Sequence, residues 1–141
     1  MPSLKTRRIL DVVLSVVALA ILSRCLVDVI PPKDYTISNM LHLKRRVMLY
    51  AQAHNELPTS ITALPPMEGY DNSNLDGWKR EIIFEVSKEG VVTFRSLGRD
   101  GVVGGAGEDA DIVRSFATHG SEGRWSDELV DWVGGEDTLG K

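Results

Sequence analysis

Apolar positions near the N-terminus predict a membrane-spanning helix. The stretch 9–30 is apolar almost throughout, and residues 12–23 carry no charge. Its 22 residues are about enough to cross a bilayer as a helix. Asp11, Arg24 and Asp28 lie near its ends, where charged groups can reach the interface. We therefore expect a transmembrane helix over residues 9–30.

Basic residues before this stretch predict its orientation. Lys5, Arg7 and Arg8 precede the apolar run, which favours a cytoplasmic N-terminus and places the bulk of the protein on the other side. A cleaved signal peptide is the alternative. Ser23-Arg24-Cys25 does not provide the small-residue cleavage site that such a peptide requires.

A second, amphipathic helix is predicted over about residues 35–54, because apolar residues recur there at spacings of three and four. Its apolar stripe consists of Ile37, Met40, Leu41, Val47, Met48 and Ala51. Pro31 and Pro32 end the first helix, since proline lacks the amide hydrogen that a helix interior needs. The basic triplet 44–46 interrupts the stripe, and we interpret it as a solvated face.

Two strands joined by a tight turn follow the helices. Residues 82–86 and 91–95 are rich in β-branched and aromatic side chains, and Lys88-Glu89-Gly90 forms a short hairpin turn between them. The second strand leads directly into a stretch rich in glycine and acidic residues, 96–112. The hairpin would hold one end of that stretch rigid.

The C-terminal residues 113–141 have a weaker pattern. Ser126 is a suitable N-cap for a short helix, and acidic residues follow it in the first turn. Gly134 and Gly135 would end this helix.

Composition excludes several classes of function. The net charge of −4 and the pI near 5.3 argue against a nucleic-acid partner. Cys25 is the single cysteine, so no internal disulfide can form. The serines lack a nucleophile context, and the histidines have no second histidine at metal-ligand spacing. The glycine-rich stretch has no lysine followed by serine or threonine, as a phosphate-binding loop would. We expect no enzymatic activity and no small-molecule substrate.

The glycine-rich stretch 96–112 is the candidate functional site. Glycine at this density lets the backbone adopt positive φ angles and point carbonyl oxygens inward. Its clustered carboxylates repel one another unless a positive charge lies between them. A hard cation suits such oxygen ligands, and calcium tolerates irregular geometry best. The spacing is not that of an EF-hand. A solvated acidic turn is the alternative. The acids are Asp100, Glu108, Asp109 and Asp111.

Three motifs give the chain a resemblance to a known family. Leu57-Pro58-Thr59 resembles a Tyr-Pro-Thr turn, and residues 76–80, Asp-Gly-Trp-Lys-Arg, resemble an Asp-Pro-Trp-Gly-Asn segment. The most specific match is residues 96–112, where several spacings agree at once. The order of elements and these motifs resemble the major pseudopilin, or G subunit, of the type II secretion system, which is type IV pilin-like. The resemblance covers about residues 55–112.

The resemblance implies a fold and a metal site. The fold would be α+β, with a transmembrane helix, a second helix packed on a small antiparallel sheet, and a metal-binding loop. The family's loop binds Ca²⁺, and the implied ligands are three carboxylates and two backbone oxygens. Glu108 is an alternative to Asp109. The implied ligand residues are Leu97, Asp100, Val103, Asp109 and Asp111.

The resemblance also implies partners and a location. The chain would be a structural subunit in the bacterial inner membrane, with one membrane span and a periplasmic C-terminal domain. Its partners would be other pseudopilins or secretion-apparatus subunits, or further copies of itself in a polymer. We divide it into a cytoplasmic segment 1–8, the span 9–30, a pseudopilin-like domain 31–112 and an extension 113–141.

The N-terminus departs from the family pattern. A pseudopilin has a Gly-Phe junction after its basic leader, which a prepilin peptidase cuts, and a glutamate shortly after it. Residues 6–11, Thr-Arg-Arg-Ile-Leu-Asp, contain no such junction, although Asp11 could stand where the glutamate would. We therefore expect the chain to keep its N-terminal residues. The alternative function is a stand-alone, membrane-anchored, calcium-stabilised binding module that does not polymerise.

Overall fold

The computed structural model describes residues 11–17, 30–120, 122–126 and 131–133. The chain divides into two compact units, residues 1–30 and residues 31–141. In the first unit, residues 11–17 are helical, and the rest of the predicted span up to residue 29 lies outside the described residues. Among the residues that are described, no helix is both long enough and apolar enough to cross a membrane.

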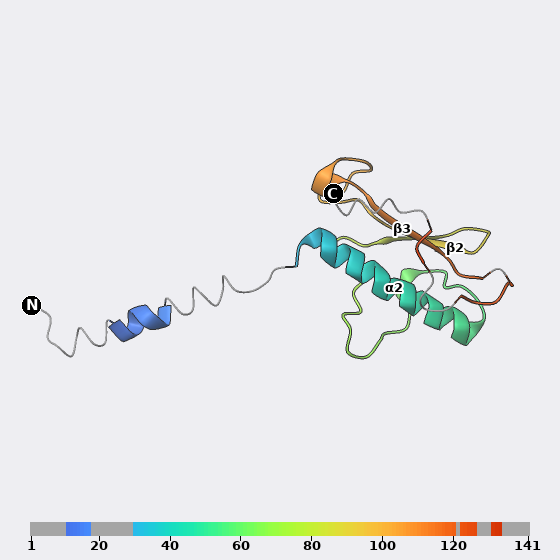
Figure 1. Cartoon of the computed structure of the whole chain (residues 1–141), viewed down its shortest axis with the longest axis horizontal. Coiled ribbons are helices and arrows are strands. Elements are labelled where there is room, and N and C mark those ends of the chain that lie inside the picture. The colour runs from blue at the N-terminus through green and yellow to red at the C-terminus, as the bar shows by residue number, and fades with distance from the viewer. Residues whose placement is uncertain (1–10, 18–29, 121, 127–130, 134–141) are drawn as a thin grey trace, which may run out of the picture. The chain divides into compact units, whose positions relative to one another are not determined.

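The second unit consists of one long helix and a three-stranded antiparallel sheet (Figure 1). The sheet has the strand order β1-β2-β3, and each strand is antiparallel to its neighbour. This confirms the expected α+β class, with a helix packed on a small antiparallel sheet. The elements are α2 (Pro32–His54), β1 (Ile83–Val86), β2 (Val91–Ser96) and β3 (Ile112–Ala117), with 3₁₀ turns at Ile61–Ala63 and Gly107–Asp109.

Helix α2 begins three residues earlier than predicted and ends where predicted. Pro32 occupies its first turn, where a missing amide hydrogen costs nothing because that position has no intrahelical acceptor. Asn55 ends the helix in the left-handed conformation, with φ of 53°. The face toward the core is fully buried at Met40, Leu43, Val47, Met48 and Ala51. Leu41, predicted on the apolar stripe, is 48% exposed, which corrects that assignment.

The core lies between α2 and one face of the sheet. The register pairs Val92 with Phe116, and both side chains are fully buried on this face. Phe94 lies between Phe84 and Phe116, with ring centroids 5.9 and 6.0 Å away. Aromatic rings at these separations add to the stabilisation that burial gives. Strand β3, which completes the core, was not predicted from the sequence.

The basic triplet on α2 is not a solvated face, as the sequence had indicated. Arg45 is exposed, but Lys44 and Arg46 are buried. The Lys44 ammonium lies 4.7 Å from the centre of the Trp132 ring, as a cation–π contact. Burial lowers the pKa of Lys44, and the charge of Asp131 opposes this shift.

Arg46 connects α2 to the long connection before the sheet. Its guanidinium donates to the carbonyl oxygens of Leu64 and Pro65 at 3.1 and 2.8 Å. It also donates to the carbonyl oxygen of Asn72 at 3.3 Å and to Asn74 Oδ1 at 3.1 Å. Burial lowers the pKa of Arg46. The buried charge is therefore stabilised by four oxygen acceptors from residues 64–74, none of which is a carboxylate.

The described part of the C-terminal region also differs from the prediction. Residues 131–133 are not helical, and residues 127–130 and 134–141 lie outside the described residues. The Val133 amide donates to the Ser115 carbonyl at 2.6 Å, in a bridge beside β3. The Trp132 ring packs edge-on against Phe116, with centroids 5.8 Å apart. These contacts with the sheet favour an extended backbone over a helix.

A group of hydrogen bonds holds the N-terminal half of α2 against residues 73–80. The Gly77 amide donates to Thr36 Oγ1 at 2.8 Å, and this hydroxyl donates to the Pro32 carbonyl at 2.7 Å. Asn39 donates to the carbonyls of residues 73 and 75 at 3.0 and 2.8 Å. A Cβ on Gly77 would overlap the Pro32 carbonyl oxygen, so only glycine allows this approach.

The Arg46 contacts predict a large effect of substitution. Arg46→Met keeps the aliphatic volume but removes the four donated hydrogen bonds and leaves buried acceptors unsatisfied. We expect it to lower the free energy of unfolding by about 3 kcal/mol, as is typical when buried polar groups lose a charged partner. Urea unfolding of residues 31–141 measures this. Arg45→Met, at the exposed neighbouring position, is the matched control and should change stability by less than about 0.5 kcal/mol. Equal effects would contradict the role of Arg46.

Candidate functional site

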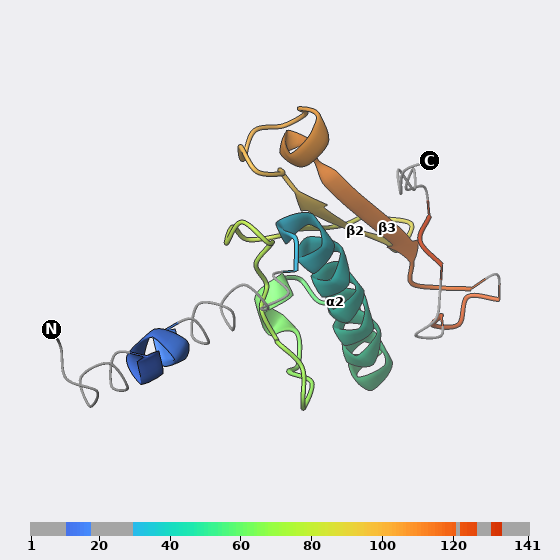
Figure 2. The same cartoon turned by 60° about the vertical axis from the view of Figure 1, so that its left-hand side comes forward.

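The glycine-rich loop, residues 97–111, connects β2 to β3 and projects beyond the end of the sheet (Figure 2). The register pairs Ser96 with Ile112, so the two ends of the loop start from neighbouring positions. Both of these residues are buried. The loop therefore has a fixed base, while Val103 in its outer part is 73% exposed.

The loop has two limbs, the first leaving β2 and the second leading into β3. Two glycines let these limbs approach each other closely. Gly98 has φ of 63°, and a Cβ there would lie 2.6 Å from the Asp109 carbonyl oxygen and 2.7 Å from that of Ala110. Gly105 has φ of 87°, and its Cβ would lie 2.5 Å from the same Asp109 oxygen. Two backbone hydrogen bonds close the loop. The Arg99 amide donates to the Glu108 carbonyl at 2.8 Å, and the Asp111 amide donates to that of Gly104 at 3.2 Å.

Arg99 binds two of the loop's acids. Its Nε and Nη2 donate to the two carboxylate oxygens of Asp109 at 2.8 and 3.0 Å, and its Nη1 donates to Glu108 Oε2 at 3.1 Å. The hydrogen bond with Asp109 raises the pKa of Arg99 above its ordinary value, and the charges of Asp109, Glu108 and Asp100 add to the shift. Glu108 and Asp109, between which the sequence left the choice of ligand open, therefore share one guanidinium.

The other two acids have different partners. Asp100 Oδ1 accepts a hydrogen bond from the Val102 amide at 3.0 Å. Asp111 Oδ1 accepts one from the Gly104 amide at 3.1 Å, and its Oδ2 lies 3.4 Å from Arg95 Nη1. Each carboxylate offers about four lone-pair positions, so these contacts leave acceptor capacity on both side chains.

The predicted ligands fit calcium in their chemistry but are not gathered around one point. Within the described ranges, no three side chains of His, Cys, Asp or Glu form a group that could hold a metal ion. Carboxylate and carbonyl oxygens are the donors that calcium prefers, and Asp100 and Asp111 can still accept. Asp109 accepts one hydrogen bond from Arg99 on each oxygen, which leaves acceptor capacity on this carboxylate as well. The two backbone carbonyl oxygens that were predicted as ligands belong to Leu97, near the base of the loop, and to the exposed Val103.

The base of the loop is held by Asp76, which is 1% exposed. Its Oδ2 accepts a hydrogen bond from the Ser96 hydroxyl at 2.7 Å. Its Oδ1 accepts from the amides of Trp78 and Arg80, each at 2.9 Å. The Arg80 Nη1 in turn donates to the Arg99 carbonyl at 3.0 Å. Asp76 thus connects the turn 76–80 to both the end of β2 and the first limb of the loop.

Asp76, Arg80 and Arg99 have roles that were not predicted from the sequence. Asp76 is part of the motif that carried the family resemblance, but nothing local shows that its partner is Ser96, twenty residues away. The pairing of Arg99 with acidic residues could have been predicted from the sequence, because Arg99 is the one basic residue in the loop 97–111 and lies among four acids.

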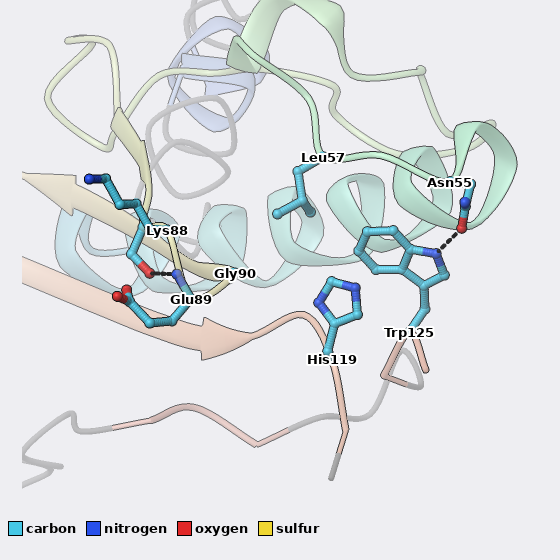
Figure 3. A pocket seen from close by; sticks show the side chains of 8 residues that line it. Asn55, Leu57, Lys88, Glu89, Gly90, His119 and Trp125 are labelled. Carbon is cyan, nitrogen blue, oxygen red and sulfur yellow. Dashed lines mark hydrogen bonds between the residues drawn. The ribbon is translucent and has the colours of Figure 1, made fainter. Parts of the chain in front are cut away.

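A separate, open cavity of about 560 Å³ lies between the end of α2 and the β1–β2 turn. Figure 3 shows His119 and Trp125 side by side below Leu57, and the two ring centroids are 4.1 Å apart. The Trp125 Nε1 donates to Asn55 Oδ1 at 3.0 Å. His119 Nδ1 shares a hydrogen bond with the Thr118 hydroxyl at 3.1 Å. Trp125 and His119 are held by these contacts, so we interpret this side of the cavity as a structural junction.

No family model matches the chain, and neither the curated proteins nor the solved structures contain a significant match.

The close approach at Gly98 predicts a substitution effect that separates crowding from backbone strain. Gly98→Ala should destabilise the protein strongly, because its Cβ would overlap two carbonyl oxygens. Gly107 has the same φ of 63° but no atom within 4 Å of its Cβ position, so Gly107→Ala is the matched control. We expect Gly107→Ala to cost about 1 kcal/mol from the left-handed conformation alone, and Gly98→Ala to cost clearly more. Thermal unfolding measures both, and equal midpoints would contradict the close approach.

Proposed function

We propose that this chain is a structural subunit of a type II secretion system, or of a related pilus apparatus, similar to the major pseudopilin. It acts by assembly, with no chemistry of its own. Its partners are other pseudopilins, further secretion-apparatus subunits or copies of itself. Residues 9–30 anchor it in the bacterial inner membrane, and the domain that follows lies in the periplasm.

The observation that carries this proposal is the construction of the glycine-rich loop. The motif that resembles the family most specifically, residues 96–112, joins two adjacent antiparallel strands. The turn 76–80, the second motif of the resemblance, bonds directly to its base through Asp76 and Ser96. Two motifs that are separate in sequence are therefore parts of one assembly. The α+β architecture, with α2 across the sheet, supports the same proposal.

The proposal includes a calcium ion bound by this loop. Its ligands would be the carboxylates of Asp100, Asp109 and Asp111, with backbone oxygens of Leu97 and Val103. The ion would add positive charge to a loop that carries four carboxylates. The chain's own residues already fix the loop's limbs, because the glycines allow close packing and Asp76 holds the base.

Calcium binding predicts a metal-dependent stability. If calcium binds only the folded form, a free concentration one hundred times the dissociation constant stabilises the domain by about 2.7 kcal/mol. Thermal unfolding of residues 31–141 should show a higher midpoint with calcium than with excess chelator. Magnesium should substitute poorly, because it prefers a tight octahedral shell.

Two variants localise this effect. Asp100→Asn keeps an oxygen that can accept from the Val102 amide but removes the charge, and it should abolish most of the calcium-dependent rise. Glu89→Ala, in the exposed β1–β2 turn, should leave the rise intact. A wild-type midpoint that does not respond to chelator would show that the loop is an ordinary acidic turn.

The proposed location predicts the topology of the chain. Three basic residues before the apolar run favour a cytoplasmic N-terminus. A reporter enzyme that is active only outside the cytoplasm, fused after Lys141, should therefore be active. A reporter that works only in the cytoplasm, fused at the same point, serves as the control and should be inactive. The reverse result would overturn the topology.

A further inference from the structure

Two aspartates of the chain are followed directly by glycine, in the pairs Asp76-Gly77 and Asp100-Gly101. In such a pair the backbone nitrogen of the glycine can attack the aspartate Cγ, because glycine has no side chain to hinder the approach. The attack forms a five-membered succinimide ring and releases water. Both pairs have the same reacting groups, so their surroundings in the fold decide whether they react.

The fold protects the first pair. Asp76 is 1% exposed, and its carboxylate accepts three hydrogen bonds, from one hydroxyl and two backbone amides. The Gly77 nitrogen is also engaged, since it donates its hydrogen to Thr36 Oγ1 at 2.8 Å. Gly77 packs directly against the Pro32 carbonyl, which leaves its backbone no room to turn. Neither the nitrogen nor the carboxylate is therefore free to move into the geometry of attack.

The second pair lies in the outer part of the glycine-rich loop. Asp100 is exposed, and its Oδ1 accepts one hydrogen bond, from the Val102 amide at 3.0 Å. This bond closes a ring of atoms that includes both the Asp100 Cγ and the Gly101 nitrogen, as in an Asx turn. The side chain is thereby directed toward the residue that would attack it. Among the described residues, none accepts a hydrogen bond from the Gly101 amide.

A positive charge lies next to Gly101. The Arg80 guanidinium packs against this glycine, with Nη1 3.1 Å from the position that a Cβ would take. The same nitrogen donates to the Arg99 carbonyl at 3.0 Å, which holds the guanidinium in place. The Gly101 nitrogen loses its proton during the attack. A fixed positive charge nearby stabilises the negative charge that develops there.

We propose that Asp100 is a site of spontaneous isomerisation to isoaspartate, and that the fold protects Asp76 from the same reaction. The Gly101 nitrogen bonds to the Asp100 Cγ, and one carboxyl oxygen leaves as water with the amide proton and the carboxyl proton. Water then adds to the ring carbonyl that belonged to the main chain and breaks its bond to nitrogen. The backbone now runs through Cβ and Cγ, and no atom is gained or lost overall.

The product changes the outer part of the loop and leaves its base intact. Isoaspartate adds one carbon to the backbone and moves the free carboxylate to Cα, so the hydrogen bond from the Val102 amide is lost. The contact of Asp76 with Ser96 and the pairing of Ser96 with Ile112 lie outside the altered segment. The modified chain should therefore remain folded.

Ageing of the purified full-length chain for several weeks, at neutral pH and physiological temperature, tests the proposal. Trypsin separates the two sites, because it releases Asp76 in peptide 47–79 and Asp100 in peptide 100–114. Fragmentation by electron transfer in the mass spectrometer distinguishes isoaspartate from aspartate. We expect Asp100 to convert at least about tenfold faster than Asp76, because the positioning of reacting groups changes rates by such factors. A sample digested before ageing measures the product that digestion itself forms.

Two controls separate the effect of the fold from that of the sequence. In guanidinium chloride both pairs are unfolded, so the two aspartates should convert at similar rates. Asp100→Glu keeps the charge in the folded chain but would have to form a less favourable six-membered ring. The variant should therefore give no isomerised product at position 100.

Three results would overturn the proposal. The first is equal conversion of the two aspartates in the folded chain, or faster conversion of Asp76. The second is conversion of Asp100 in guanidinium chloride but not in the folded chain, because the loop would then protect it. The third is a similar difference between the two sites in guanidinium chloride, which would show that neighbouring residues and not the fold set the rates.

Discussion

The buried carboxylate of Asp76 is the constraint on which the rest of the described fold depends. Removing a carboxylate from water is costly unless hydrogen bonds replace the lost solvation. Asp76 accepts from two backbone amides and from the Ser96 hydroxyl, and Arg80 Nε lies 3.8 Å from its Oδ2. Those donors belong to the turn 76–80 and to the end of β2, so these two segments must lie together for the charge to be tolerated.

The same turn also sets the position of α2. Gly77, the residue after Asp76, donates its amide to Thr36 and lies against the Pro32 carbonyl. The helix start, the turn and the base of the glycine-rich loop are thus connected through consecutive residues. Apolar packing on Phe94 and Phe116 fills the space between α2 and the sheet but is not directional. The polar contacts fix the orientation of α2, because each hydrogen bond needs a particular donor and acceptor geometry.

Hydrophobic periodicity predicted α2, β1 and β2, but it failed where partners are distant in sequence. Strand β3 was missed because Arg114 occupies a core-facing position, opposite Phe94, and breaks the apolar alternation. Arg46 looked like a surface residue because its acceptors lie 18 to 28 residues further along the chain. The loop's acids were found from local composition alone. Their pairing with Arg99 depends on how the glycines fold the two limbs together, and composition does not specify that.

The three arginines at the loop differ in how readily a cation could replace them. Arg80 contacts the loop through a backbone carbonyl and packs against Gly101, so it cannot exchange with a carboxylate-bound ion. The Arg95 side chain is 35% exposed and projects from β2, whose register with β3 fixes its distance from Asp111. Arg99 is 57% exposed, and no strand holds its backbone. Solvent screens exposed pairs most, so a cation reaches the Arg99 pairs most easily. Arg99 nevertheless holds Asp109 with two paired hydrogen bonds at 2.8 and 3.0 Å, whereas Arg95 makes a single contact of 3.4 Å with Asp111. Exposure and hydrogen-bond geometry therefore favour opposite carboxylates for replacement of an arginine by a cation.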